Sequence, residues 1–160
     1  MRYQICKKDV IRLVGIKTRL TEEHEKNMVK IPLFWKQTIE TAQFRQICGL
    51  AEQEPYGVLG VSAYFDPQHI FYYIAAATGQ PVPQGLEELY LPAATWCVAA
   101  KGPFRSTTFA NLFRDFYFEY LPSTGMAYAA LPDIEVYPPE GRGTETSIRE
   151  AWFAVKQADR

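Results

Sequence analysis

The predicted secondary-structure elements occur in the same order twice along the chain, and this repetition restricts the possible folds more than any other feature. Each half is predicted to form a strand, a helix and then two strands. The elements of the first half fall at 9–20, 31–47, 58–65 and 71–78, and those of the second half at 93–100, 107–121, 133–137 and 150–156. A repeated supersecondary unit favours two copies packed into one fold. We therefore expect a single domain over 1–160, duplicated at about 1–80 and 85–160, with a pseudo-twofold axis.

The two helices are predicted from different signals. For 31–47, Pro32 suits the first helical position and Gly49 suits the residue just past the end. For 107–121, Ser106 or Thr107 could cap the N-terminus, and apolar residues recur at helical spacing, namely Phe109, Leu112, Phe113, Phe116 and Tyr120. The polar segment 21–27 and the segment 79–90, which is rich in Pro and Gly, are expected to be connections.

Several of the predicted strands are apolar on both faces. The runs VLGVSAYF, FYYIAAAT and AATWCVAA lack the alternation of an antiparallel sheet that has one solvated face. One face must meet the two helices, and the other must be covered by loops, a partner or a ligand. The prediction is an α+β fold whose antiparallel sheet has two helices on one face and a ligand cleft on the other.

One acidic residue interrupts the apolar strand at 133–137. Ile134 and Val136 flank Glu135, and Tyr137 follows. Because side chains alternate across a strand, Glu135 and Tyr137 would face the cleft if Ile134 and Val136 faced the helices. The duplication aligns Glu135 with Ala63, so the repeated fold itself does not require the acid.

Burying this carboxylate costs free energy unless it is paired. Its partner could be an arginine of the chain, with Arg105, Arg114 and Arg142 as candidates, or a cation that binds from outside. The plainer alternative is a Glu at a sheet edge that faces water or forms a local ion pair. For Trp35, Trp96 and Tyr73, the plainer alternative is packing in the core.

Composition and charge exclude several classes of protein. Apolar residues make up 48% of the 160 residues, too many for a disordered chain. The net charge is −1 and no cluster of basic residues is present, so we expect no direct binding to nucleic acid. Three separated cysteines and two histidines form neither a disulfide framework nor a metal-ligand pattern, so we expect no metal or cofactor. Without a signal peptide or a long apolar run, we expect no membrane association and a cytoplasmic location.

Four motifs, in order along nearly the whole chain, resemble those of the GyrI-like effector-binding domain. LVGIKTRL is similar to the family's first strand, with Gly15 at its usual place, and IPLFWKQT to the start of its first helix, with Trp35 as its tryptophan. LPAATWCVAAKGPF is similar to the strand that leads into the family's glycine-proline turn, and DIEVYPP to its E-x-Y segment. This domain is the ligand-sensing part of AraC/XylS-type and MerR-type multidrug regulators, and it also occurs alone.

The resemblance implies a cleft between the two repeats in which the acid of the E-x-Y segment meets lipophilic cations. Carried over, Glu135 is that acid, with Tyr137 beside it. The aromatic candidates for the same cleft are Trp35, Tyr64, Tyr73, Trp96 and Phe104. Regulators of the family carry a separate DNA-binding region, for which the effector fold leaves no room here. The chain, a monomer or a homodimer, would then regulate transcription through a separate DNA-binding regulator chain or as one remnant of a larger gene.

Three functions remain open from the sequence. The first is a binding protein for amphipathic, cationic small molecules, with no catalytic residues. The second is a hydrolase, because some relatives hydrolyse reactive cyclopropane compounds, and Glu135 and Tyr137 could then act as base and proton donor. No nucleophile elbow accompanies them. The third is a protein-interaction module, since the family's founding members are linked to gyrase.

Overall fold

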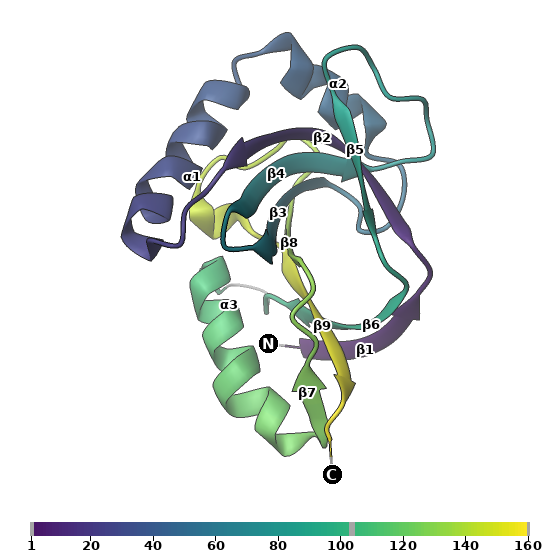
Figure 1. The fold of residues 1–160 in the computed structure, drawn as a ribbon, viewed down its shortest axis with the longest axis vertical. Helices are drawn as coiled ribbons and strands as arrows, with labels where there is room; N and C mark the ends of the chain where they lie inside the picture. Colours follow the sequence, from purple (N-terminus) through teal and green to yellow (C-terminus); the bar gives the residue numbers. More distant parts are fainter. Residues whose placement is uncertain (1, 103–104, 160) are drawn as a thin grey trace.

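A nine-stranded antiparallel sheet with three α-helices makes up the computed structural model, which describes residues 2–102 and 105–159 (Figure 1). The strands are β1 (Arg2–Lys8), β2 (Ile11–Arg19), β3 (Val58–Asp66), β4 (His69–Ala77), β5 (Glu87–Leu91), β6 (Ala94–Ala100), β7 (Met126–Tyr128), β8 (Asp133–Tyr137) and β9 (Glu150–Gln157). The α-helices are α1 (His24–Thr38), α2 (Ala42–Leu50) and α3 (Phe109–Asp115). The α+β class, the antiparallel sheet and the repeated unit are confirmed.

The strand order is symmetric about the pair formed by β8 and β3. It runs β1-β6-β9-β8-β3-β4-β2-β5, with β7 pairing on β9. The two edge strands are exchanged between the halves, because β1 pairs with β6 and β5 pairs with β2. Two predictions were therefore incomplete. The segment 79–90 is not only a connection, because β5 begins within it, and the N-terminal residues before the predicted first strand form β1.

The first predicted helix differs from the observed one in both its start and its continuity. Helix α1 begins at His24, within the polar segment expected to be a loop, and Pro32 lies in its interior. The chain breaks after Thr38 and restarts as α2, where the Thr41 side chain accepts a hydrogen bond from the Phe44 N–H at 3.2 Å. The polar residues of 21–27 were misleading because the first turns of α1 are largely exposed. Gly49 lies inside α2 rather than past its end.

The second predicted helix is less regular than its apolar spacing suggested. Its cap is Thr108, not Ser106 or Thr107, and the Thr108 side chain accepts from the Asn111 N–H. After α3, the chain continues as a π-helical turn over Phe116–Tyr120 and a 3₁₀ turn over Leu121–Ser123. No helix in the described part of the chain is both long and apolar enough to cross a membrane.

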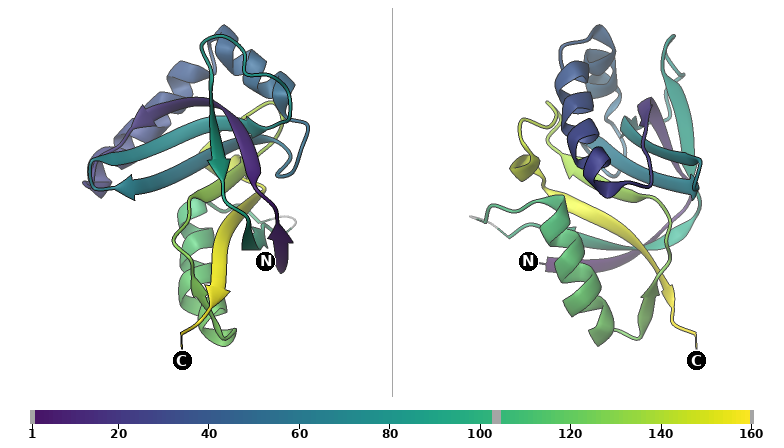
Figure 2. Two further views of the ribbon diagram at one scale, coloured as in Figure 1. Left: turned by 45° about the vertical axis from the view of Figure 1, so that its right-hand side comes forward. Right: turned by 60° about the vertical axis from the view of Figure 1, so that its left-hand side comes forward.

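The sheet has a separate hydrophobic core on each face. All three helices pack on one face, where Trp35, Phe44, Leu112 and Phe116 meet side chains from the sheet. The other face buries a second cluster drawn from strands of both halves, which includes Leu13, Val61, Trp96, Ile134 and Trp152. The sheet is strongly curved (Figure 2), so its own strands enclose this cluster. Of the expected covers, only a loop contributes in the described structure, since Ala129 and Leu131 between β7 and β8 pack against this cluster.

Candidate functional site

Glu135 and Tyr137 lie on the face of β8 that the helices cover. Tyr137 belongs to the helix-side core, whereas Ile134 and Val136 belong to the core of the other face. This is the reverse of the orientation predicted from the sequence. The prediction failed because β8 is buried on both faces, so the alternation of its side chains does not show which face lies toward the helices.

A small network of hydrogen bonds surrounds the Glu135 carboxylate. The Tyr137 hydroxyl donates to Glu135 Oε1 at 2.5 Å. The Trp35 indole Nε1–H donates to the Tyr72 hydroxyl at 2.9 Å, and the Trp35 ring packs edge-on against both tyrosine rings. Gly60 is paired with Glu135 across the strands, and a Cβ at Gly60 would lie 2.0 Å from the Tyr72 hydroxyl and 3.3 Å from the Glu135 carboxyl carbon. Glycine at this position therefore provides the space in which the tyrosine and the acid meet.

The predicted equivalence of Glu135 and Ala63 does not agree with the sheet. Glu135 is paired with Gly60, and Ala63 belongs to the core of the opposite face. The alignment on turn prolines put the two strands out of phase by one residue, which exchanges their faces.

The protonation of Glu135 depends on two opposing influences. Burial raises the pKa of the carboxyl group, because the charged form loses its hydration. The hydroxyls of Tyr137 and Tyr72 and the positive charge of Arg142 act in the other direction. The pKa of both tyrosines is raised, mainly by burial and also by the neighbouring Glu135 charge. The two hydroxyls and Arg142 thus favour the charged carboxylate, but they do not fully offset the cost of burying its charge.

A cavity of about 210 Å³ opens above this carboxylate, between α1 and the start of α3. Helix α1 contributes His24, Met28, Ile31 and Pro32, and the other wall contains Thr108, Phe109 and Ala110. Glu135, Tyr137, Arg142 and Glu145 complete the lining. The cavity thus has apolar walls and an acid on the side formed by the sheet.

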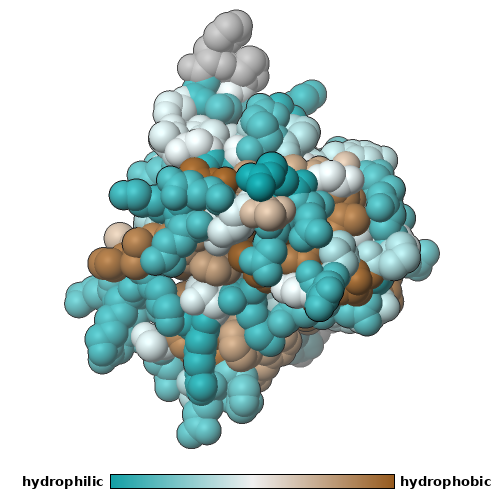
Figure 3. Space-filling view, turned by 90° about the horizontal axis from the view of Figure 1, so that it is seen from above, coloured by the Kyte–Doolittle hydropathy of each residue, from teal (hydrophilic) through white to brown (hydrophobic). Residues whose placement is uncertain are grey.

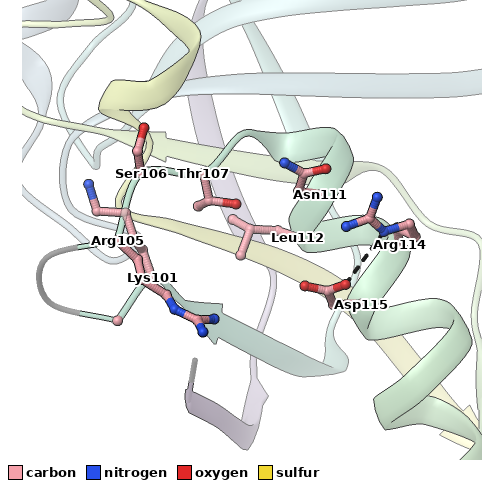
Figure 4. A pocket seen from close by; sticks show the side chains of 9 residues that line it. Lys101, Arg105, Ser106, Thr107, Asn111, Leu112, Arg114 and Asp115 are labelled. Carbon is pink, nitrogen blue, oxygen red and sulfur yellow. Dashed lines mark ion pairs between the residues drawn. The ribbon is translucent and has the colours of Figure 1, made fainter.

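Of the three arginines considered as partners for Glu135, only Arg142 lines this cavity. Arg105 and Arg114 lie in a different hollow, together with Lys101, Ser106 and Asn111 (Figure 4). There Arg114 Nε lies 3.6 Å from Asp115 Oδ1. Within the described residues Glu135 forms no ion pair, because the nitrogens of Arg142 are not within 4.0 Å of its oxygens.

The structure brings together only some of the aromatic residues predicted for the site. Trp35 contacts Tyr137 beside Glu135, with ring centroids 5.3 Å apart. Trp96 and Tyr73 lie in the core of the opposite face. Tyr64 is exposed and lines a separate hollow with Asp133. Phe104 lies outside the described residues.

Two polar residues of the region, the buried Tyr72 and the half-buried Asp133, were missed in the sequence. Tyr72 was passed over in favour of its neighbour Tyr73, because the apolar run FYYI does not show which tyrosine faces the helices. Asp133 lies two positions before Glu135 on the same face, and its Oδ1 accepts from the Tyr128 hydroxyl at 2.7 Å. Burial raises the pKa of Asp133 to about 7. The signal for Asp133 was its i, i+2 spacing from Glu135.

Comparison with known structures supports the fold over the full length of the chain. A candidate bacterial transcription regulation protein from Staphylococcus aureus MU50 aligns with a TM-score of 0.72 and 21% identity, covering 98% of this chain and 99% of that one. The structure of SAV2435 bound to tetraphenylphosphonium aligns with a TM-score of 0.74 and 21% identity, covering 98% and 94%. The EcmrR C-terminal domain aligns with a TM-score of 0.55 and 10% identity, covering 98% of both chains.

No curated protein matches the sequence. The GyrI-like small molecule binding domain, in contrast, matches over residues 1–156, which include every strand from β1 to β8 and nearly all of β9. The chain therefore belongs to the family of GyrI-like small molecule binding domains.

Proposed function

We propose that this protein binds amphipathic aromatic cations in the cavity between α1 and α3, with Glu135 as their charge partner. The observation that carries the proposal is a buried carboxylate that borders an apolar cavity and forms no ion pair within the described residues. A buried negative charge without a partner is costly, so a ligand cation that reaches it gains more than it would in water.

The lining of the cavity supports a ligand that is both apolar and charged. Met28, Ile31, Pro32 and Phe109 offer hydrophobic contacts worth about 25 cal/mol per Å² of apolar surface removed from water. Three of the polar lining residues, Glu135, Arg142 and Glu145, carry charge, so charge as well as shape would select ligands. SAV2435, a structural neighbour of the same fold, has been solved with the aromatic cation tetraphenylphosphonium.

The proposal is tested by titrating tetraphenylphosphonium against tryptophan fluorescence. The anion tetraphenylborate has nearly the same shape and the opposite charge, so it is a matched control for the ligand. We expect the wild type to bind the cation and to discriminate against the anion. Glu135→Gln should weaken cation binding about tenfold or more, because a charge-assisted interaction of about 1.5–3 kcal/mol is lost. Glu54→Gln removes an exposed carboxylate elsewhere and should leave affinity unchanged. Equal affinity in the wild type and Glu135→Gln would reject Glu135 as the charge partner.

The hydrolase alternative is less well supported by the same geometry. The Tyr137 hydroxyl already donates to Glu135, and burial raises the pKa of both groups, so this tyrosine is a poor proton donor to a substrate. Among the described residues, the cavity lining adds no serine or cysteine nucleophile. We therefore propose binding without catalysis.

A regulatory role is proposed to depend on a second chain. The strands and helices of the described residues form one effector-type fold, and the net charge of −1 does not suit DNA binding. We propose that a separate DNA-binding regulator in the cytoplasm responds to the ligand-bound state. The face shown in Figure 3 is mostly hydrophilic, with hydrophobic residues in small separate areas, so it offers no broad apolar docking surface.

A further inference from the structure

The cavity beside Glu135 already contains a cation that belongs to the protein. The Arg142 guanidinium carbon lies 5.8 Å from the centroid of the Trp35 ring and 5.9 Å from that of Tyr137. These distances are within the range at which a cation is attracted by the face of an aromatic ring. Arg142 also lines the same cavity as Glu135.

Arg142 is close to the acid but is not locked to it. Burial raises the pKa of Glu135, and the positive charge of Arg142 opposes that rise, although the two side chains form no ion pair. Its Nε is buried and has no hydrogen-bond partner in the described structure. A buried N–H without an acceptor is unfavourable, so a guanidinium that moved into water would recover its hydration. Arg142 also acts on the Tyr137 hydroxyl, whose pKa it lowers against the larger effect of burial, so the arginine is held by the tyrosine but not by an ion pair to Glu135.

The backbone next to Arg142 is held more firmly than its side chain. Gly141 has φ of 101°, and a Cβ at this position would lie 2.3 Å from the Phe44 ring of α2. The Gly141 N–H also donates to the Pro138 carbonyl oxygen at 2.8 Å. Only the flexible side chain of Arg142 then has to move when the cavity opens, and the anchored backbone keeps it near the rings.

The size of the cavity indicates why this movement matters. Its volume of about 210 Å³ is below the roughly 300–1,000 Å³ of pockets that enclose drug-sized ligands. Withdrawal of the guanidinium would enlarge the cavity and expose the faces of Trp35 and Tyr137. A large aromatic cation could then replace both the charge and the ring contacts of the arginine.

We propose that Arg142 is the resident cation of this cavity and a specificity-determining residue: a ligand binds by displacing its guanidinium from Trp35 and Tyr137. This inference rests on the proposed function, because Arg142 would compete with the proposed ligand for the same cavity. The tethered guanidinium has a high effective concentration at the site. Small compact cations therefore fail to displace it, whereas bulky aromatic cations succeed because they also bury apolar surface.

The first test compares tetraphenylphosphonium binding in the wild type, Arg142→Ala, Arg142→Gln and Arg142→Lys. If the guanidinium occupies the cavity about 90% of the time, its removal should tighten binding about tenfold. Arg142→Gln should also bind more tightly, and Arg142→Lys, which keeps the charge, should stay nearer to the wild type. Arg105→Ala removes the same charge from an exposed residue of another hollow, so it controls for net charge. Weaker binding in Arg142→Ala, or affinities equal to those of Arg105→Ala, would overturn the displacement.

The second test does not depend on the aromatic ligand. Ethylguanidinium, added at millimolar concentration, should fill the space left in Arg142→Ala and raise its melting temperature, with no such effect on the wild type or Arg105→Ala. If ethylguanidinium stabilises Arg142→Ala while no variant binds tetraphenylphosphonium, the proposed function fails and the resident cation stands. If Arg142→Ala gains no stability from ethylguanidinium, the resident cation is rejected, even when the wild type binds tetraphenylphosphonium in a Glu135-dependent way.

Discussion

At the scale of single residues, the helix-side face of β8 places two carboxylates close together. Asp133 and Glu135 are two positions apart, which is about 7 Å along a strand. Burial raises the pKa of both groups, that of Asp133 to about 7, and the charge of Glu135 adds to the effect on Asp133. In an unfolded chain an Asp titrates near 4, so folding favours the protonated form of Asp133. Stability that comes from this proton is fully present below about pH 4 and is lost as the pH rises through about 7.

Asp133→Asn should therefore reduce the pH dependence of stability. Between about pH 4 and 7, this aspartate lowers the free energy of unfolding of the wild type by up to about 1.4 kcal/mol per pH unit. The amide resembles the protonated acid and still offers an oxygen to the Tyr128 hydroxyl. Urea unfolding should show Asp133→Asn as more stable than the wild type at pH 8 and similar to it below about pH 4. The exposed Asp9 supplies the control, since Asp9→Asn should follow the wild type. A constant offset between the Asp133→Asn and wild-type curves would exclude Asp133 as the titrating group.

The chemical identity of the central acid could be predicted from the sequence, but its surroundings could not. A lone Glu between Ile134 and Val136 is conspicuous in any apolar strand. Which face it occupies depends on how β8 pairs with β3, and both faces of these strands are buried over most of their length. The same ambiguity hid Tyr72 behind Tyr73, because side-chain periodicity cannot assign faces where polarity does not alternate.

At the scale of secondary-structure elements, two glycines test how closely the packing is matched to the site. Gly60→Ala in β3 would force the buried Tyr72 hydroxyl out of the position in which it accepts the hydrogen bond from Trp35. We expect a loss of about 1–3 kcal/mol in the free energy of unfolding, which is typical of overpacking. Gly49→Ala in α2 is the matched control, because no atom lies within 4 Å of the new Cβ. It should stabilise the protein by up to about 1 kcal/mol through helix propensity. Chemical denaturation measures both, and a neutral Gly60→Ala would contradict the packing described here.

The strands were easier to predict than the helices, for a physical reason. The turn at Asp66–His69 and the apolar runs around it defined β3 and β4 to within a few residues. Helix α1 was missed over its first turns because an exposed helical turn and a polar loop have similar compositions. Pro32 was also compatible with either the first turn or the interior of a helix, so it did not locate the start of α1. The wall of the cavity that contains His24 and Met28 was therefore not foreseen.

At the scale of the whole molecule, the exchanged edge strands connect the two repeats more firmly than the sequence suggested. The duplication predicted two similar units, and the symmetric strand order agrees with it. No local pattern indicated that β1 would pair with β6 over Arg2–Lys8, or that β5 would pair with β2, because pairing between distant strands depends on the assembled sheet. Each half of the chain thus supplies the edge strand for the part of the sheet formed by the other half.

This exchange predicts that the two halves unfold together. Trp35 reports on the helix-side core of the first half, and Trp152 reports on the second core near β9. Two variants that each keep one of these tryptophans, with phenylalanine at the other two tryptophan positions, should each show a urea transition by fluorescence. Each transition should share its midpoint with that variant's far-UV circular dichroism curve, because neither repeat can keep its edge strand once the other is lost. A fluorescence midpoint clearly below the circular dichroism midpoint in either variant would show that one half unfolds alone. That outcome would contradict the conclusion that the exchanged edge strands couple the repeat that carries α1 to the repeat that carries α3.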